Sequence, residues 1–220
     1  MSEPARTSWK MGGITNEAVE TYMYSLLPAR DEVLAEIEAE AAKRNIPIVG
    51  PLVGRMLHLI ATVSGARRIF EMGSAVGYST IWWARAVGPQ GRVLYTDGDA
   101  KNAAEARRYF ERAGVADRIE LHTGDALEIL SEQKSGEFDI IFCDIDKDEY
   151  PRAFKLAVPR IRQGGLLMAD NVLYKGQVAL PAQDERVKAI QEFNRLLYSS
   201  KELEPVIVPL RDGVSVARKV

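Results

Sequence analysis

Five apolar runs of strand length alternate with helical segments between residues 67 and 170, and this alternation constrains the fold most. Strands that alternate with helices indicate a parallel sheet whose crossover helices cover both faces. We therefore predict an α/β fold. The strands are expected at 67–72, 91–97, 118–123, 138–144 and 164–170, with helices at 78–87, 100–113, 126–131 and 149–162.

The two ends of the chain differ from this middle part. Apolar residues recur at helical spacing from 15 to 45, with a break at Pro28, and a third helix is expected over 51–64. Near the other end, a helix over 184–199 precedes two β-rich runs that meet at Asp212-Gly213, a hairpin signal. We predict one domain, residues 1–220, with a helical cap (about 1–64) on an α/β core (65–220). Its seven-stranded, mainly parallel sheet would carry a C-terminal antiparallel hairpin.

Composition excludes several classes of function. The net charge of −2 provides no basic field for nucleic acid. Cys143 is the only cysteine, so no internal disulfide can form and a reducing compartment is expected. The histidines His58 and His122 lie in no zinc-like cluster. With no signal-type N-terminus and no apolar stretch of 18 residues, we expect a cytoplasmic protein without a membrane partner.

A glycine-containing turn follows the first predicted strand, in the segment FEMGSAVGYST (70–80). Gly73 and Gly77 allow a tight turn and close backbone approach to a ligand, but neither a dinucleotide fingerprint nor a P-loop is present. Glu71 would repel a phosphate and suits a cationic amino group. Ser79 and the helix amides suit a carboxylate. The turn is therefore typical of a site for an amino-acid moiety.

Acidic residues also end or follow the next two strands. Asp97 ends the second strand at a distance suited to ribose hydroxyls. Asp125 and Ala126 follow the third strand, where a side chain and an amide could contact adenine. Each aspartate alone could equally be a helix cap. Their coincidence at three successive strand ends favours S-adenosylmethionine.

The last two parallel strands end in a different chemistry. Asp144 ends the fourth strand, and Asp170 and Asn171 end the fifth. Carboxylate and amide oxygens suit Mg²⁺, Mn²⁺ or Ca²⁺. The alternative is that both aspartates cap the segments that follow them. We favour the metal, because two strand-end acids beside an apolar core would otherwise repel each other.

EMGSAVGYST, DIDKDEY and ADNVL resemble the cation-dependent O-methyltransferase family, which includes catechol and caffeoyl-CoA O-methyltransferases. The resemblance covers nearly the whole chain, and DIDKDEY is closer to the caffeoyl-CoA and bacterial branch. It implies a Rossmann-like class I methyltransferase fold, a homodimer, metal ligation by Asp144, Asp170 and Asn171, and a catalytic Lys147. The implied cofactor contacts are Val49, Glu71, Gly73, Ser74, Ser79, Asp97, Ala126 and Asp146.

The expected reaction is methyl transfer to one hydroxyl of a vicinal-diol phenol. Ionising a phenol at pH 7 costs roughly 4 kcal/mol, which a divalent cation can offset. Lys147 either accepts the proton or stays charged and stabilises the phenolate, since Asp146, Asp148 and Glu149 favour its charged form. A solvated surface lysine is the alternative. Asp148 and Glu149 are expected to start the next helix.

Two positions depart from known members of the family. Lys175 stands where plant enzymes have a substrate-contacting asparagine, which argues against caffeoyl-CoA as the acceptor. Val206 stands where catechol methyltransferase has an active-site glutamate. Substrate specificity is expected in the N-terminal segment and around residues 174–181. Another small molecule or an RNA base as acceptor, and a non-catalytic cofactor-binding protein, remain as alternatives.

Overall fold

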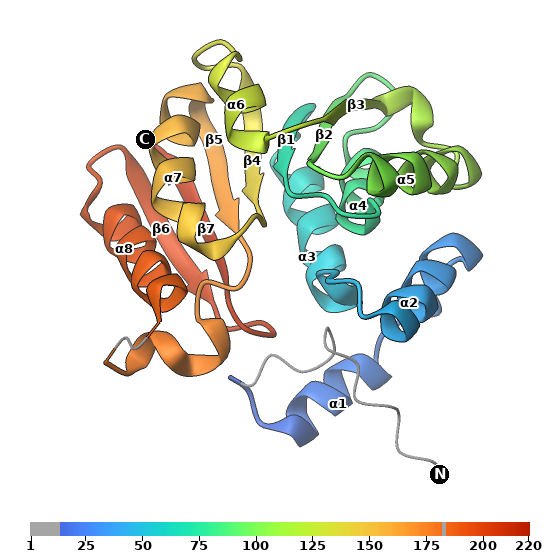
Figure 1. The fold of residues 1–220 in the computed structure, drawn as a ribbon, viewed down its shortest axis with the longest axis horizontal. Coiled ribbons are helices and arrows are strands. Elements are labelled where there is room, and N and C mark those ends of the chain that lie inside the picture. The colour runs from blue at the N-terminus through green and yellow to red at the C-terminus, as the bar shows by residue number, and fades with distance from the viewer. Residues whose placement is uncertain (1–13, 182–183) are drawn as a thin grey trace.

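The computed structural model describes residues 14–181 and 184–220, which form helices around a seven-stranded sheet of order β3-β2-β1-β4-β5-β7-β6 (Figure 1). The parallel strands are β1 (Arg68–Met72), β2 (Arg92–Asp97), β3 (Ile119–Thr123), β4 (Phe138–Cys143) and β5 (Ile161–Ala169). β6 (Leu203–Val208) and β7 (Val214–Lys219) form an antiparallel hairpin, and β7 pairs with β5. The predicted α/β fold and hairpin are confirmed.

The central strands are apolar on both faces because helices cover both faces. Ile69 and Phe70 on β1 and Ile140 and Ile141 on β4 are completely buried. β1 and β4 are neighbours although β2 and β3 lie between them in sequence, so the strand order reverses between them. Open α/β sheets bind ligands outside the carboxyl ends of their strands at such a reversal. A ligand site is therefore expected where β1 and β4 end.

The described residues include eight α-helices, of which α2 to α8 form two apolar cores with the sheet. One core lies under α2 to α5, and the other lies under α6 to α8. The helices are α1 (Glu17–Ser25), α2 (Glu32–Arg44), α3 (Gly50–Val63), α4 (Tyr78–Ala86), α5 (Ala100–Arg112), α6 (Ala126–Ser131), α7 (Tyr150–Arg160) and α8 (Glu185–Ser199). Short 3₁₀ segments are η1 (Ala116–Arg118), η2 (Lys147–Glu149) and η3 (Tyr174–Ala179). No helix within the described ranges is long and apolar enough to cross a membrane.

Polar contacts fix the N-terminal helices to the core. Arg30 forms an ion pair with Glu38 on α2 at 2.9 Å, and the hydroxyl of Tyr78 on α4 donates to Glu38 at 2.8 Å. Asn45 ends α2 in the left-handed conformation (φ 56°), and the chain then continues toward α3 through residues 46–49. The start of α4 is thereby tied to α2 in the N-terminal cap.

One boundary differs clearly from the sequence prediction. The helix expected over 149–162 ends at Arg160, and β5 begins at Ile161 instead of residue 164. Ile161 is completely buried and pairs with Phe138, and the register then shifts between Phe138 and Ile140. Tertiary packing of one isoleucine thus ends the helix early and extends the strand.

Candidate active site

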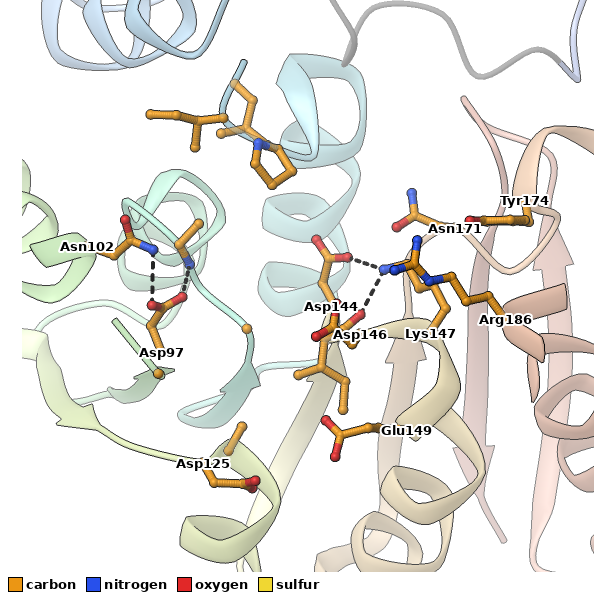
Figure 2. Close-up of a pocket in the computed structure, with 18 of the residues that line it drawn as sticks. Asp97, Asn102, Asp125, Asp144, Asp146, Lys147, Glu149, Asn171, Tyr174 and Arg186 are labelled. Atoms are coloured by element: carbon orange, nitrogen blue, oxygen red, sulfur yellow. Dashed lines mark hydrogen bonds and ion pairs between the residues drawn. The ribbon is translucent and has the colours of Figure 1, made fainter. Parts of the chain in front are cut away.

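A cavity of about 820 Å³ opens at the carboxyl ends of the parallel strands, where the reversal of strand order predicts a ligand (Figure 2). Its size suits a nucleoside-containing cofactor together with a small second molecule. The wall is built by the segments that follow β1 to β5, by residues 45–48 and by two arginines, Arg186 and Arg211. Of the predicted site residues, it brings together Gly73, Asp97, Asp125, Ala126, Asp144, Asp146, Lys147 and Asn171.

The glycine turn lies directly against the end of β4. Gly73 has a φ of 78°, and a Cβ atom added there would collide with the backbone carbonyl of Asp144. Gly77 has a φ of 82°, and its added Cβ would collide with the ring of Phe110. Only glycine meets both conditions at these two positions, positive φ and no space for a side chain. The two strand ends that flank the reversal are therefore in backbone contact.

Glu71 is completely buried under this turn. Burial raises the pKa of Glu71 to about 7, against the opposing effect of the hydroxyl of Thr80 and the nearby hydroxyls of Ser79 and Ser74. The Thr80 hydroxyl donates to Oε2, while Oε1 has no hydrogen-bond partner among the described residues. A cationic amine beside Oε1 would satisfy this oxygen and favour the charged carboxylate.

Four predicted cofactor contacts lie behind the cavity wall instead of on it: Val49, Glu71, Ser74 and Ser79. All four are nearly or completely buried, and the neighbouring residues Ile48, Gly73 and Ala75 form the wall. Their role as cofactor contacts stays a prediction. Glu71 is the one whose unsatisfied oxygen gives it an independent physical reason to meet a ligand.

Asp97 is held rigidly beside the glycine turn. Its Oδ2 accepts the amide of Ala75 at 2.9 Å, and its Oδ1 accepts the amide of Asp99 at 2.9 Å and the side-chain amide of Asn102 at 3.1 Å. A carboxylate has about four acceptor positions, so these three bonds orient it and leave capacity for a ligand hydroxyl. Asp99, and not Asp97, caps the following helix α5.

Asp125 does act as a helix cap, the alternative that the sequence left open. Its Oδ1 accepts the amides of Leu127 at 2.7 Å and Glu128 at 2.9 Å at the start of α6. It also lines the cavity next to Ala126. Both bonds use the same oxygen, so Oδ2 is available to a ligand. Capping and ligand contact are therefore compatible at this residue.

Lys147 is not a solvated surface lysine, so that alternative is wrong. Its side chain is 16% exposed, and Nζ donates to Oδ1 of Asp144 at 2.9 Å, the carbonyl of Ile145 at 3.0 Å and the hydroxyl of Tyr150 at 2.9 Å. Burial alone would lower the pKa of Lys147, but the charge and hydrogen bond of Asp144 outweigh it and raise the pKa. The lysine is held in its charged form.

The fifth strand ends in an ion-pair network that the sequence did not reveal. Asp170 is completely buried, and its Oδ2 pairs with the guanidinium of Arg211 from the β6–β7 turn. Nδ2 of Asn171 donates to Asp170 at 3.2 Å and to Asp212 at 2.8 Å. Burial raises the pKa of Asp170 to about 6, although Arg211 opposes this shift. The sequence analysis identifies Asp212 only as part of the hairpin turn and gives Arg211 no role.

Three oxygens beside this network are left without hydrogen bonds among the described residues. Oδ1 of Asp170 is buried and unpartnered, and no bond is made by Oδ2 of Asp144 or Oδ1 of Asn171. No group of three His, Cys, Asp or Glu side chains within the described ranges could hold a metal, so a metal site here would need the amide oxygen of Asn171 as a third protein donor. Such oxygen donors fit a hard divalent cation.

Arg186, opposite the cofactor side, is missed by the sequence analysis, whereas Tyr174 lies in the segment 174–181 where specificity is expected. Tyr174 and Arg186 line the cavity, whereas Lys175, the predicted substrate position, is exposed and does not line it. Arg186 lies in the first turn of α8, and Figure 2 shows its side chain reaching toward Lys147. The only available signal was an arginine at a helix start, which normally denotes a solvated residue.

The remaining acids and the cysteine near this strand end behave mostly as expected. Cys143 is completely buried, and burial raises the pKa of its thiol to about 12, so it is an inert core residue. Asp148 and Glu149 lie at the start of the helical segment, as predicted. Glu149 also lines the cavity, where burial and the nearby charge of Asp125 raise its pKa.

Comparison with known proteins agrees with this geometry. An O-methyltransferase family model matches residues 25–220. A catechol O-methyltransferase of Niastella koreensis is 34% identical over 212 residues, which cover 91% of this chain and 96% of that protein. One of Mycobacterium tuberculosis is 37% identical over 168 residues, covering 76% of each chain. The structure of an O-methyltransferase from Bacillus cereus in complex with S-adenosylhomocysteine (SAH) has a TM-score of 0.84 and 34% identity, covering 92% of this chain and 97% of that one. The chain therefore belongs to the O-methyltransferase family and is an S-adenosylmethionine-dependent O-methyltransferase.

Proposed function

We propose that this enzyme methylates one hydroxyl of a vicinal-diol phenol and requires a divalent cation to do so. The observation that carries the proposal is the unpartnered Oδ1 of Asp170, which is buried behind the cavity wall beside Asn171, and Asn171 lines the cavity together with Asp144 and Lys147. A buried carboxylate oxygen without a partner is costly unless a cation completes it. The names of the Niastella and Mycobacterium relatives support a catechol-type acceptor.

Asp144, Asp170 and Asn171 would hold the cation, with Mg²⁺ as the expected ion. When bound, the cation supplies Lewis-acid stabilisation of an ionised hydroxyl and fixes the orientation of a diol. Burial disfavours the ionised carboxylate of Asp170, and the positive charge of Arg211 partly offsets this effect. The two carboxylates that would bind the cation are thus each paired with a cationic side chain in the protein, Asp144 with Lys147 and Asp170 with Arg211.

The cofactor would occupy the other half of the cavity. The amino group of S-adenosylmethionine would meet Glu71, its ribose would meet Asp97, and its adenine would lie beside Asp125 and Ala126. Methyl transfer would form an oxygen–carbon bond as the carbon–sulfur bond breaks, which releases SAH, and the proton of the ionised hydroxyl would pass to solvent water. The in-line arrangement depends on both ligands being positioned by the same cavity.

Lys147 is assigned the electrostatic role and not that of a base. Its ammonium is paired with Asp144 and hydrogen-bonded to Tyr150, and this pairing keeps it protonated. A charged lysine cannot accept the phenolic proton, but it can stabilise the phenolate oxygen that attacks the methyl group. Methionine substituted for Lys147 should therefore lower kcat even at high pH.

The test is methyl transfer from S-adenosylmethionine to a catechol, followed by mass spectrometry with and without Mg²⁺. We expect product only with the metal, and none from a monophenol of the same shape. Undiminished activity in excess EDTA would remove the metal from the proposal. Calorimetric binding of SAH without turnover on any diol would instead favour the non-catalytic alternative.

A further inference from the structure

One cation of the cavity wall comes from the C-terminal hairpin. Arg211 lies in the turn between β6 and β7, lines the cavity and is only 8% exposed. Its backbone is left-handed (φ 56°), although the residue is not a glycine. Non-glycine residues in this conformation cost free energy and persist where the surrounding structure holds them. The turn therefore places a guanidinium at the site against a backbone preference.

Two backbone hydrogen bonds fix this turn against the segment that follows β5. The amide of Val172 donates to the carbonyl of Gly213 at 3.0 Å, and the amide of Leu173 donates to the carbonyl of Asp212 at 2.9 Å. The packing is close, because a Cβ atom added at Gly213 would collide with Leu173. The backbone of the arginine is thus fixed relative to the end of β5, where two of the proposed metal ligands lie.

Arg211 occupies one oxygen of a proposed metal ligand. Its guanidinium pairs with Oδ2 of Asp170 and lies 3.6 Å from Oδ1 of Asp212, and both carboxylates are buried. Nε of Arg211 is buried without a hydrogen-bond partner among the described residues. The pairing with carboxylates is therefore the interaction that offsets the burial of this charge. Lys147 occupies Oδ1 of Asp144 in the same way, at 2.9 Å.

These internal cations leave little negative charge for a metal ion. The group consists of Asp144, Asp170, Asp212, Lys147 and Arg211. Its three carboxylates and two cations leave one net negative charge, which a divalent cation would turn into one net positive charge. Without the arginine, the same ion would neutralise the group. Charges that share one carboxylate lie close enough for their repulsion to change affinity by about tenfold or more, even at the effective dielectric constant of a protein site.

We propose that Arg211 is a built-in competitor of the divalent cation: it pairs with Asp170 in the metal-free protein and weakens metal binding there. This inference rests on the metal ligands proposed above and adds how their affinity is set. Arg211 acts on the metal through Asp170 and takes no part in the methyl transfer. The site thus stays folded while no metal is bound, and it needs a higher metal concentration to fill than a site without the arginine.

The test measures Mn²⁺ binding to the SAH-bound protein by calorimetry at pH 8. Arg211→Gly removes the charge and suits the left-handed backbone, so it should fold even if Arg211→Met does not. We expect Arg211→Gly to bind Mn²⁺ at least about tenfold more tightly than the native protein. Arg211→Lys keeps a positive charge and should stay close to the native affinity. Arg162→Met removes an arginine that pairs with Asp139 at the opposite end of β5, and this matched control should bind Mn²⁺ as the native protein does.

Urea unfolding with and without Mn²⁺ gives a second readout that is independent of turnover. A ligand that binds more tightly stabilises the folded state more, so Mn²⁺ should raise the unfolding midpoint further in Arg211→Gly than in the native protein. Equal or weaker Mn²⁺ binding by Arg211→Gly would overturn the inference, while metal-dependent turnover of the native enzyme would still support the proposed function. Tighter binding by Arg211→Gly, together with native turnover that resists EDTA, would support the inference and contradict the proposed metal dependence alone.

Discussion

The two halves of the cavity are built by different means. On the cofactor side, Asp97 and Asp125 are held mainly by backbone amides, most of them within three residues in sequence. On the acceptor side, Asp170 and Asn171 are held by side chains of Arg211 and Asp212, 41 residues away. Backbone amides fix a geometry that side-chain substitution changes little. Paired charges can be altered one residue at a time, so the acceptor side is where specificity can vary.

Removal of Asp144 should have the largest effect, and it should affect only the acceptor half. Asp144→Ala removes one proposed metal ligand and the partner of Lys147, so we expect turnover to fall at least about a thousandfold. Affinity for SAH, measured by calorimetry, should change only a few-fold. The exposed neighbour Asp148, changed to Ala, is the control and should keep its activity. Equal losses of turnover and SAH affinity would show that the two halves are not separable.

Arg211→Met tests the charge balance of the acceptor half through stability. It leaves Asp170 and Asp212 without their cation, and unpairing a buried charge costs about 3–5 kcal/mol. Because the pKa of Asp170 is already raised to about 6, its carboxyl can protonate, and the loss should be smaller at pH 5 than at pH 7. Urea unfolding at both pH values measures this difference. Arg162→Met, which breaks a more exposed pair with Asp139, should cost under about 1 kcal/mol.

Glu71→Gln tests the cofactor half through pH dependence. The carboxyl pKa is raised in the folded protein to about 7, so the folded state binds more protons than the unfolded state between pH 4.5 and about 7. Stability of the ligand-free protein should therefore fall by up to about 3 kcal/mol as pH rises through this window. The Gln variant should lack this loss and unfold at higher urea concentration than the native protein at pH 8. Glu120 is partly exposed, so Glu120→Gln should keep the same loss of stability with rising pH as the native protein. Identical pH profiles for both variants would contradict burial as the cause.

Asp97→Ala should have the smallest effect and should be confined to the cofactor. Loss of the ribose contact and of the bond to the Ala75 amide is expected to weaken SAH binding about tenfold, measured by calorimetry. Asp99→Ala removes the cap of α5 and should lower stability by about 1 kcal/mol while SAH affinity stays the same. If Asp99→Ala weakened SAH binding and Asp97→Ala did not, the ribose would not lie at Asp97.

The fold could be predicted from the sequence because it is encoded mainly in local patterns of residues. The alternation of strands and helices and the Asp-Gly turn depend on neighbouring residues, and the error at Ile161 arose where long-range packing decided the boundary. Strand-end residues such as Asp97, Asp144 and Asp170 could be found for the same reason. Homodimer formation, the single-domain boundaries and the cytoplasmic location stay predictions.

The acceptor side was less predictable. Arg211 and Asp212 reach Asp170 and Asn171 only because β7 pairs with β5, a neighbour relation that no local pattern contains. Arg186 similarly reaches the same cavity wall as Tyr174 only through the tertiary fold. Charged residues in turns and at helix starts are usually exposed to solvent. Their sequence context therefore did not indicate that Arg211 and Asp212 are buried or that Arg186 lines the cavity.

The contact between Gly73 and the carbonyl of Asp144 has a consequence for how such an enzyme can change. The turn after β1, which is expected to hold the methyl donor, lies directly against the end of β4, which is expected to hold the acceptor. A shift of one segment would therefore move the other. Methyl transfer tolerates little variation in the distance between sulfur, methyl carbon and oxygen. We therefore expect acceptors to be distinguished away from this contact, while the interval over which the methyl group travels stays constant.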